Sequence, residues 1–150
     1  YICYKLQSSL RDSPVNIDKM KIQHAEIIHK ISRLRELSRA GVTAHAQEIA
    51  QTVISMSSVI KVHLSTEDQF LYPYLEKVND QKLKTMSVNF QREMADIVAE
   101  YEKFSRRWNT ANKLINCDEA FRRDANVVLR KVHERMQRED HNFYPLVEQL

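Results

Sequence analysis

Residues 63–73 read His-Leu-Ser-Thr-Glu-Asp-Gln-Phe-Leu-Tyr-Pro, and residues 135–145 read Arg-Met-Gln-Arg-Glu-Asp-His-Asn-Phe-Tyr-Pro. Both stretches keep a Glu-Asp pair and a Tyr-Pro pair at the same offset. Helical periodicity places Glu67 and Glu139 near the centre of the apolar side of their segments. Turning a carboxylate towards a core costs on the order of several kcal/mol unless a cation or hydrogen-bond donors meet it. The repeat therefore predicts a helical core in which two buried anions are neutralised.

The composition indicates a single all-α domain. The 150 residues are enough for one core, and they include only one Gly and three Pro. Strict apolar and polar alternation is absent, which argues against a sheet. The net charge is +3, but basic residues alternate with acidic ones along the chain. This pattern is typical of a solvated helical surface and argues against a nucleic-acid partner.

The cysteines and the hydropathy of the sequence indicate the cellular compartment of the protein. Cys3 and Cys117 match no CxxC pattern, so we expect reduced thiols rather than a disulfide. The sequence has no apolar run of membrane-spanning length and no evident signal peptide. We therefore expect a cytoplasmic protein with no membrane partner. The chain begins with Tyr1, and the sequence leaves open what precedes it.

The apolar periodicity predicts an N-terminal arm over residues 1–15 and an up-down-up-down four-helix bundle over residues 16–150. The first helix is expected to begin between Asn16 and Asp18, where either side chain can cap it. The bundle helices are expected at about 16–41, 43–78, 81–108 and from the end of a polar connection at 109–118 to the C-terminus. We expect Pro73 to kink the second helix near its end.

Four polar side chains from three helices are predicted to face the interior together. They are His24 of the first helix, His63 and Glu67 of the second, and Glu139 of the fourth. His63 and Glu67 lie one helical turn apart, so they can hold one ion together. Two imidazoles with one or two carboxylates suit non-haem iron, manganese or zinc, and iron is favoured where coordination positions stay open. Taken singly, each residue would be a hydrogen-bonded core histidine or a salt-bridged glutamate.

The other histidines are expected outside this site. His133 lies seven residues before Asp140 and could pair with it, but its helical angle is far from that of Glu139. His29, His45 and His141 are expected on the surface.

On these residues the chain resembles a hemerythrin-like domain of the HHE cation-binding family. The resemblance rests on His24, on His63-x-x-x-Glu67 followed by Tyr72-Pro73, and on Glu139 followed by Tyr144-Pro145. It covers nearly the whole chain and implies a bundle with a non-haem, usually di-iron, centre. It also implies a role in binding or sensing oxygen, nitric oxide or redox state, and some members repair or supply iron centres.

The chain departs from the family pattern at two positions. The family has a histidine on the third helix where Met94 stands, and another where Arg135 stands. In the family these two histidines serve mainly one of the two irons. We therefore expect either one metal ion at His24, His63, Glu67 and Glu139, with Arg135 replacing the second cation, or a metal-free network of buried ion pairs.

The expected function is a cation-binding domain with non-haem iron, mononuclear rather than di-iron, that binds or senses oxygen, nitric oxide or redox state. The alternative is a metal-free bundle that acts as a regulatory protein-interaction module. The sequence has no nucleophile elbow, phosphate loop or HExxH, so we do not expect an enzyme, although oxidase or iron-centre repair activity stays open. A homodimer through Tyr101, Trp108 or the N-terminal arm is also left open.

Overall fold

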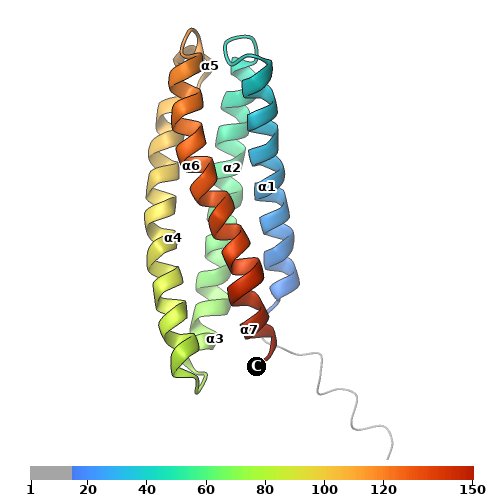
Figure 1. Cartoon of the computed structure of the whole chain (residues 1–150), viewed down its shortest axis with the longest axis vertical. Helices are drawn as coiled ribbons and strands as arrows, with labels where there is room; N and C mark the ends of the chain where they lie inside the picture. The colour runs from blue at the N-terminus through green and yellow to red at the C-terminus, as the bar shows by residue number, and fades with distance from the viewer. Residues whose placement is uncertain (1–14) are drawn as a thin grey trace, which may run out of the picture.

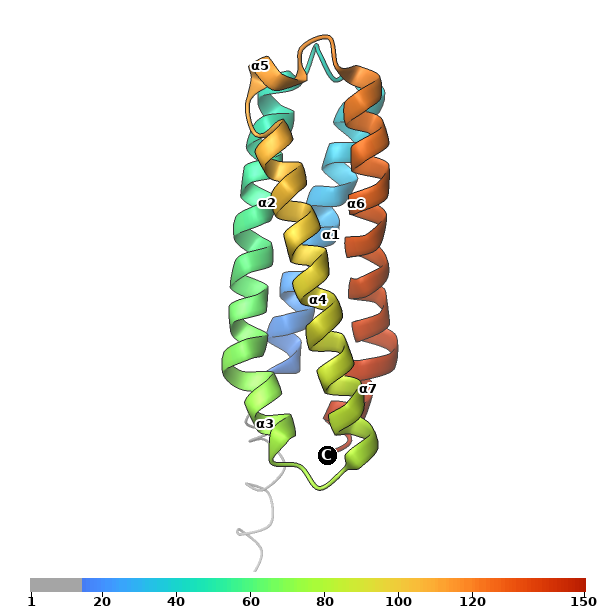
Figure 2. The same ribbon diagram turned by 90° about the vertical axis from the view of Figure 1, so that its left-hand side faces the viewer.

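The computed structural model describes residues 15–150, and within them four long helices pack side by side (Figure 1). Consecutive long helices run in opposite directions, as both views show (Figure 2). Their bounds are α1 Ile17–Ala40, α2 Ala46–Thr66, α4 Gln81–Trp108 and α6 Asp118–Arg138. The prediction of an all-α, up-down-up-down four-helix bundle is confirmed.

The second and fourth long helices do not end where their α-helical hydrogen bonding ends. Each continues through a π-helix, a wider turn with hydrogen bonds between residues five apart, into a short α-helix. The π-helices are η1 Glu67–Leu71 and η2 Glu139–Phe143, and the short helices are α3 Tyr72–Glu76 and α7 Tyr144–Glu148. Both π-helices begin at the repeated glutamate and end just before the repeated Tyr-Pro. The interruption expected at Pro73 therefore takes the form of a π-helix over the preceding five residues.

The ends of α1 follow the sequence signals. The Asn16 side chain accepts a hydrogen bond from the Lys19 amide at 3.0 Å and caps the helix. At the other end, Gly41 has a φ of 128°, a backbone conformation that residues other than glycine rarely adopt.

The predicted start of the second helix at residue 43 is wrong by three residues. Both the backbone amide and the hydroxyl of Thr43 donate to the Asp118 carboxylate at the start of α6. This contact holds the turn between α1 and α2 against α6, so α2 begins only at Ala46. The connection predicted at 109–118 contains a short helix, α5 Ala111–Leu114, that periodicity did not indicate.

The interior consists of two apolar clusters with a polar layer between them. On α1, one cluster includes Ile27 and the other includes Met20. His24 lies between these two residues in the sequence and is buried. Buried polar residues likewise lie between the part of the first cluster on α2 and the part of the second on its continuation η1 and α3, and between the part on α6 and the part on η2 and α7. The fold therefore places charged groups in the middle of a hydrophobic core.

Tyr101 and Trp108, two of the positions left open for a homodimer contact, lie in the core. Tyr101 is 1% exposed and Trp108 is 2% exposed, so neither can form a dimer contact. The Tyr101 hydroxyl donates to the Val53 carbonyl, and the Trp108 indole donates to Asp124.

Residues 1–14 of the predicted N-terminal arm lie outside the described residues. No helix within residues 15–150 is long and apolar enough to cross a membrane.

Candidate metal centre

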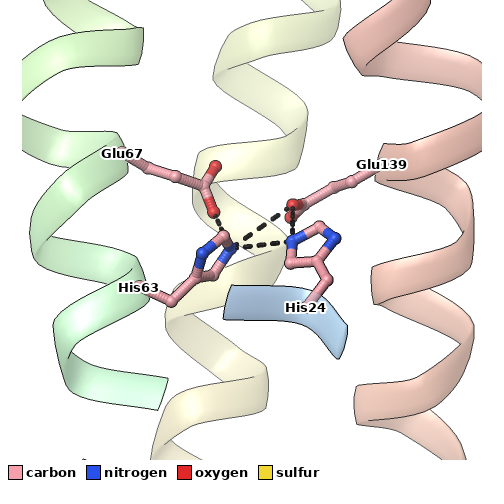
Figure 3. Close-up of side chains that lie close together, drawn as sticks. All are labelled: His24, His63, Glu67 and Glu139. Carbon is pink, nitrogen blue, oxygen red and sulfur yellow. Dashed lines mark hydrogen bonds and ion pairs between the residues drawn. The ribbon is translucent and has the colours of Figure 1, made fainter. Parts of the chain in front are cut away.

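The four residues predicted to face the interior come together in the polar layer (Figure 3). His24 lies on α1, His63 on the last turn of α2, and Glu67 and Glu139 at the starts of η1 and η2. One nitrogen or oxygen atom from each lies within 4.8 Å of the corresponding atoms of the other three. His24 is 1% exposed and the other three are fully buried. The structure therefore gathers two imidazoles and two carboxylates in a space closed to solvent.

The distances show that the Nε2 atoms of both histidines point to the centre of this group. His24 Nε2 lies 2.9 Å from His63 Nε2 and 2.9 Å from Glu139 Oε2. His63 Nε2 lies 2.5 Å from Glu67 Oε1 and 3.6 Å from Glu139 Oε2. These contacts link all four side chains in Figure 3. The separations of 2.9 and 3.6 Å match those between ligand atoms around a metal ion whose bonds are about 2.0–2.2 Å long, whereas the 2.5 Å approach of Glu67 to His63 is shorter than such a separation.

The outward nitrogen of each imidazole is held by an oxygen atom. His24 Nδ1 lies 2.8 Å from Asp140 Oδ1, and His63 Nδ1 lies 2.9 Å from Gln23 Oε1. Gln23 is oriented in turn because its amide nitrogen donates to the Thr66 hydroxyl at 3.1 Å. Both oxygen atoms are acceptors, so each Nδ1 carries a proton, and in the neutral form of either ring the Nε2 lone pair would face inward. Imidazoles that bind metals are oriented by such partners.

Glu139 has more partners than Glu67. Arg135 donates from Nε to Glu139 Oε1 at 2.5 Å, and Tyr144 donates from its hydroxyl to Glu139 Oε2 at 2.8 Å. The Tyr144 hydroxyl also lies 3.2 Å from His24 Nε2. The Arg135 guanidinium stacks on the Phe90 ring with 4.5 Å between its Cζ and the ring centroid. A buried cation and a phenol thus stabilise this carboxylate in its charged form.

Glu67 has no such support. The 2.5 Å approach of His63 Nε2 to Glu67 Oε1 does not have hydrogen-bond geometry, and both carboxylate oxygens are buried without a hydrogen bond. The Tyr72 hydroxyl and both terminal nitrogens of Arg135 are also buried without a partner. Unpaired buried polar atoms are rare in native proteins and often indicate an ion or water. The unpaired carboxylate of Glu67 fits a cation between it and the imidazoles.

The pKa values reflect the excess of negative charge. Burial lowers the pKa of His63, but the nearby carboxylates of Glu139 and Glu67 outweigh it and raise the pKa to about 9. Burial raises the pKa of Glu67, and the neighbouring Glu139 charge raises it further. Burial also acts to raise the pKa of Glu139, but its contacts with His24, His63 and Arg135 hold the value well below the usual range. The site therefore attracts a proton or another cation.

The structure places the other residues considered from the sequence away from this group. His133 contributes no atom to the cluster, and Asp140, its suggested partner, bonds to His24 instead. Met94 is fully buried among apolar side chains of the core. Its neighbour Glu93 forms an ion pair with Arg138 at the surface.

Sequence reasoning missed three residues that orient the cluster: Gln23, Asp140 and Tyr144. Two of them belong to the repeat, in which Asp140 follows Glu139 and Tyr144 precedes the proline. The repeat was therefore a usable signal for both of them. Gln23 had no signal beyond its place next to His24.

The family assignment agrees with this geometry. Residues 15–147 match the family model described as the hemerythrin HHE cation binding domain. The chain belongs to this family, as its sequence motifs suggested. Searches of curated proteins and of solved structures found no match.

Proposed function

We propose that the chain binds one non-haem iron ion through His24, His63, Glu67 and Glu139. The observation that carries this proposal is the Glu67 carboxylate, whose two oxygens are buried without a hydrogen bond beside two inward imidazole nitrogens. A buried carboxylate left in this state is strongly destabilising. A metal ion would satisfy Glu67 and both Nε2 lone pairs at once.

The formal charges of the buried groups leave one negative charge for a bound cation to meet. Glu67 and Glu139 bring two negative charges into the dry interior, and Arg135 brings one positive charge. The remaining negative charge can be met by a proton on His63, in keeping with its raised pKa, or by a metal ion. Two imidazoles and two carboxylates are a ligand set that suits iron, manganese and zinc. The family assignment favours a bound cation over a proton alone.

We propose one ion rather than two because the second half of the family ligand set is replaced. Arg135 donates to Glu139 Oε1, so this oxygen is not free to hold a second ion. Met94 offers only a thioether, a weak ligand for iron, within an apolar cluster. The guanidinium then takes the electrostatic role of the second ion.

We further propose that the domain binds or senses oxygen, nitric oxide or redox state rather than catalysing a reaction. A bound non-haem iron would supply redox chemistry and open coordination positions for a diatomic gas. The protein would hold the two imidazoles through Gln23 and Asp140 and exclude bulk water by burying all four side chains. We assign no catalytic residue.

Metal content per chain tests the proposal. Protein purified with and without air is compared with His63→Ala, and His29→Ala serves as the control because His29 is exposed on α1. We expect about one ion per chain in the wild type and in the control, and almost none in His63→Ala. Circular dichroism would show that the variants are folded. Equal metal content in all three proteins, or none in the wild type, would overturn the assignment.

A second candidate function rests on the Arg135–Glu139 pair, which neutralises one carboxylate without metal. In this case the bundle would act as a metal-free protein-interaction module. Chelation would then leave its melting temperature unchanged, whereas an iron-binding bundle would be destabilised by chelation through mass action.

A further inference from the structure

A groove between α1 and α6 lies far from the metal centre. We call it the arginine groove, and its polar lining consists of Arg35, Ser38, Arg39, Arg122 and Asn126. It has a volume of about 380 Å³ and contains leucine and alanine side chains beside the polar ones. Arg35 follows His24 by eleven residues, which is roughly 16 Å along an α-helix. The groove is therefore separate from the iron site.

The arginine groove differs from the other hollows of the surface in its charge. Three arginines line it, and no carboxylate does so among residues 15–150. Four other surface hollows within residues 15–150 each include at least one carboxylate, such as Glu100, Glu93, Glu76 or Glu134. A concave surface with charge of one sign concentrates ions of the opposite sign.

Three carboxylates near this end of the bundle already have partners. Arg33 binds both Glu36 and Glu48, and it points to that pair rather than into the groove lining. Asp118 accepts hydrogen bonds from the turn after α1, and it only approaches Arg122 at 3.8 Å. Within the described residues, Arg35 and Arg39 have no carboxylate partner. Like charges four residues apart destabilise a helix slightly, so this pair has a cost that a bound anion would remove.

The favourable dipole at the C-terminal end of α1 explains the position of only one of the three arginines. Arg39 lies in the last turn of α1, where a cation interacts favourably with the helix dipole. Arg35 lies a turn earlier, and Arg122 comes from a different helix. Arg122 is held in place because its Nη2 and Nε donate to the Ser38 carbonyl at 2.8 and 3.3 Å. These bonds leave its Nη1 free for a ligand.

We propose that the arginine groove binds a small molecule that carries a diphosphate group. Guanidinium groups match phosphate oxygens with paired, charge-assisted hydrogen bonds, and three of them suit an anion with several charges. The Ser38 hydroxyl and the Asn126 amide add neutral donors. The volume lies within the range of small-molecule sites.

Calorimetric titration of the whole chain with inorganic pyrophosphate at constant ionic strength tests the proposal. We expect saturable binding of one pyrophosphate per chain, with the affinity reduced about tenfold by Arg35→Gln or by Arg39→Gln, the loss of one charge-assisted contact. Arg92→Gln removes the same charge from an exposed position on α4 and should leave the affinity within about twofold. Arg122→Gln is less informative because it also removes the bond to Ser38.

Two further titrations distinguish binding in the groove from binding at the metal centre and from general attraction of anions. Pyrophosphate can bind metal ions, so His63→Ala should bind it as tightly as the wild type if the site is the arginine groove. Citrate at the same ionic strength should bind much more weakly than pyrophosphate. The proposal fails if binding does not saturate, if Arg92→Gln weakens it as much as the groove variants do, if His63→Ala abolishes it, or if citrate binds equally well. If His63→Ala loses metal binding but keeps pyrophosphate binding, the result supports the proposed site in the arginine groove.

Discussion

Arg135 donates a hydrogen bond from Nε to Glu139 Oε1 at 2.5 Å, with both side chains fully buried. His63 holds the equivalent place in the first repeat, one turn before Glu67. The two halves of the bundle thus place different partners beside the same buried acid. Arginine stays charged at any accessible pH, whereas histidine can lose its proton and bind a metal. One half therefore carries its own cation, and the other is open to an external one.

Replacing Arg135 with His should raise the number of metal ions per chain above that of the wild type. The variant restores a second His-x-x-x-Glu pair and removes the charge that repels a second cation. Arg138→His is the control, since Arg138 lies at the surface in an ion pair with Glu93. Metal analysis at saturating iron would show the difference. An unchanged ratio in Arg135→His would mean that Arg135 does not stand in for an ion.

Replacing Arg135 with Met should destabilise the metal-free protein by about 3 kcal/mol, because it leaves Glu139 buried without its cation. Arg138→Met should cost less than about 1 kcal/mol, since its ion pair is exposed. Urea unfolding after chelation measures both values. If Arg135 neutralises the site, added metal should restore more stability to Arg135→Met than to Arg138→Met. Equal costs for the two variants would contradict this role.

Much of the fold could be predicted because apolar periodicity and end signals agree. The cap at Asn16 and the glycine at Gly41 bound α1 as expected. The π-helices were not predicted, since helical periodicity assumes 3.6 residues per turn throughout. The start of α2 was misplaced because Thr43 binds Asp118, a contact between segments far apart in the sequence.

The candidate site could be predicted only in part. Helical angles correctly place His24 and Glu139 in the interior, because burial depends on the angle around the helix axis. They do not say which residue of a neighbouring helix lies opposite. Asp140 therefore appeared to be a partner for His133 on its own helix, whereas it bonds to His24 on α1.

Metal affinity should rise with pH between about 7 and 9. The pKa of His63 in the metal-free protein is about 9, so below that pH a metal ion must displace a proton. A raised histidine pKa gives stability that is complete below the unfolded value near 6.5 and is lost as the pH passes 9. The metal-free protein therefore loses stability over the range in which the ion gains affinity.

Competition with a chelator, with zinc as the probe, measures this dependence. Displacement of one proton corresponds to an affinity gain of about tenfold per pH unit below the pKa. Calorimetry in two buffers with different ionisation enthalpies would count the released protons directly. An affinity that does not change between pH 7 and 8.5 would show that His63 is already neutral.

The two tyrosines of the repeat should respond differently to the same substitution. Tyr144 donates to Glu139 Oε2, so Tyr144→Phe removes a group that orients a proposed ligand and should weaken metal affinity about 10- to 100-fold. The Tyr72 hydroxyl is buried without a partner, so Tyr72→Phe removes no hydrogen bond and should leave the free energy of unfolding unchanged or slightly higher. Each variant is the control for the other, because both lose one buried hydroxyl just before a proline. Equal losses of affinity would mean that Tyr72 reaches Glu67 once the ion is bound, and that both halves of the repeat orient their acids in the same way.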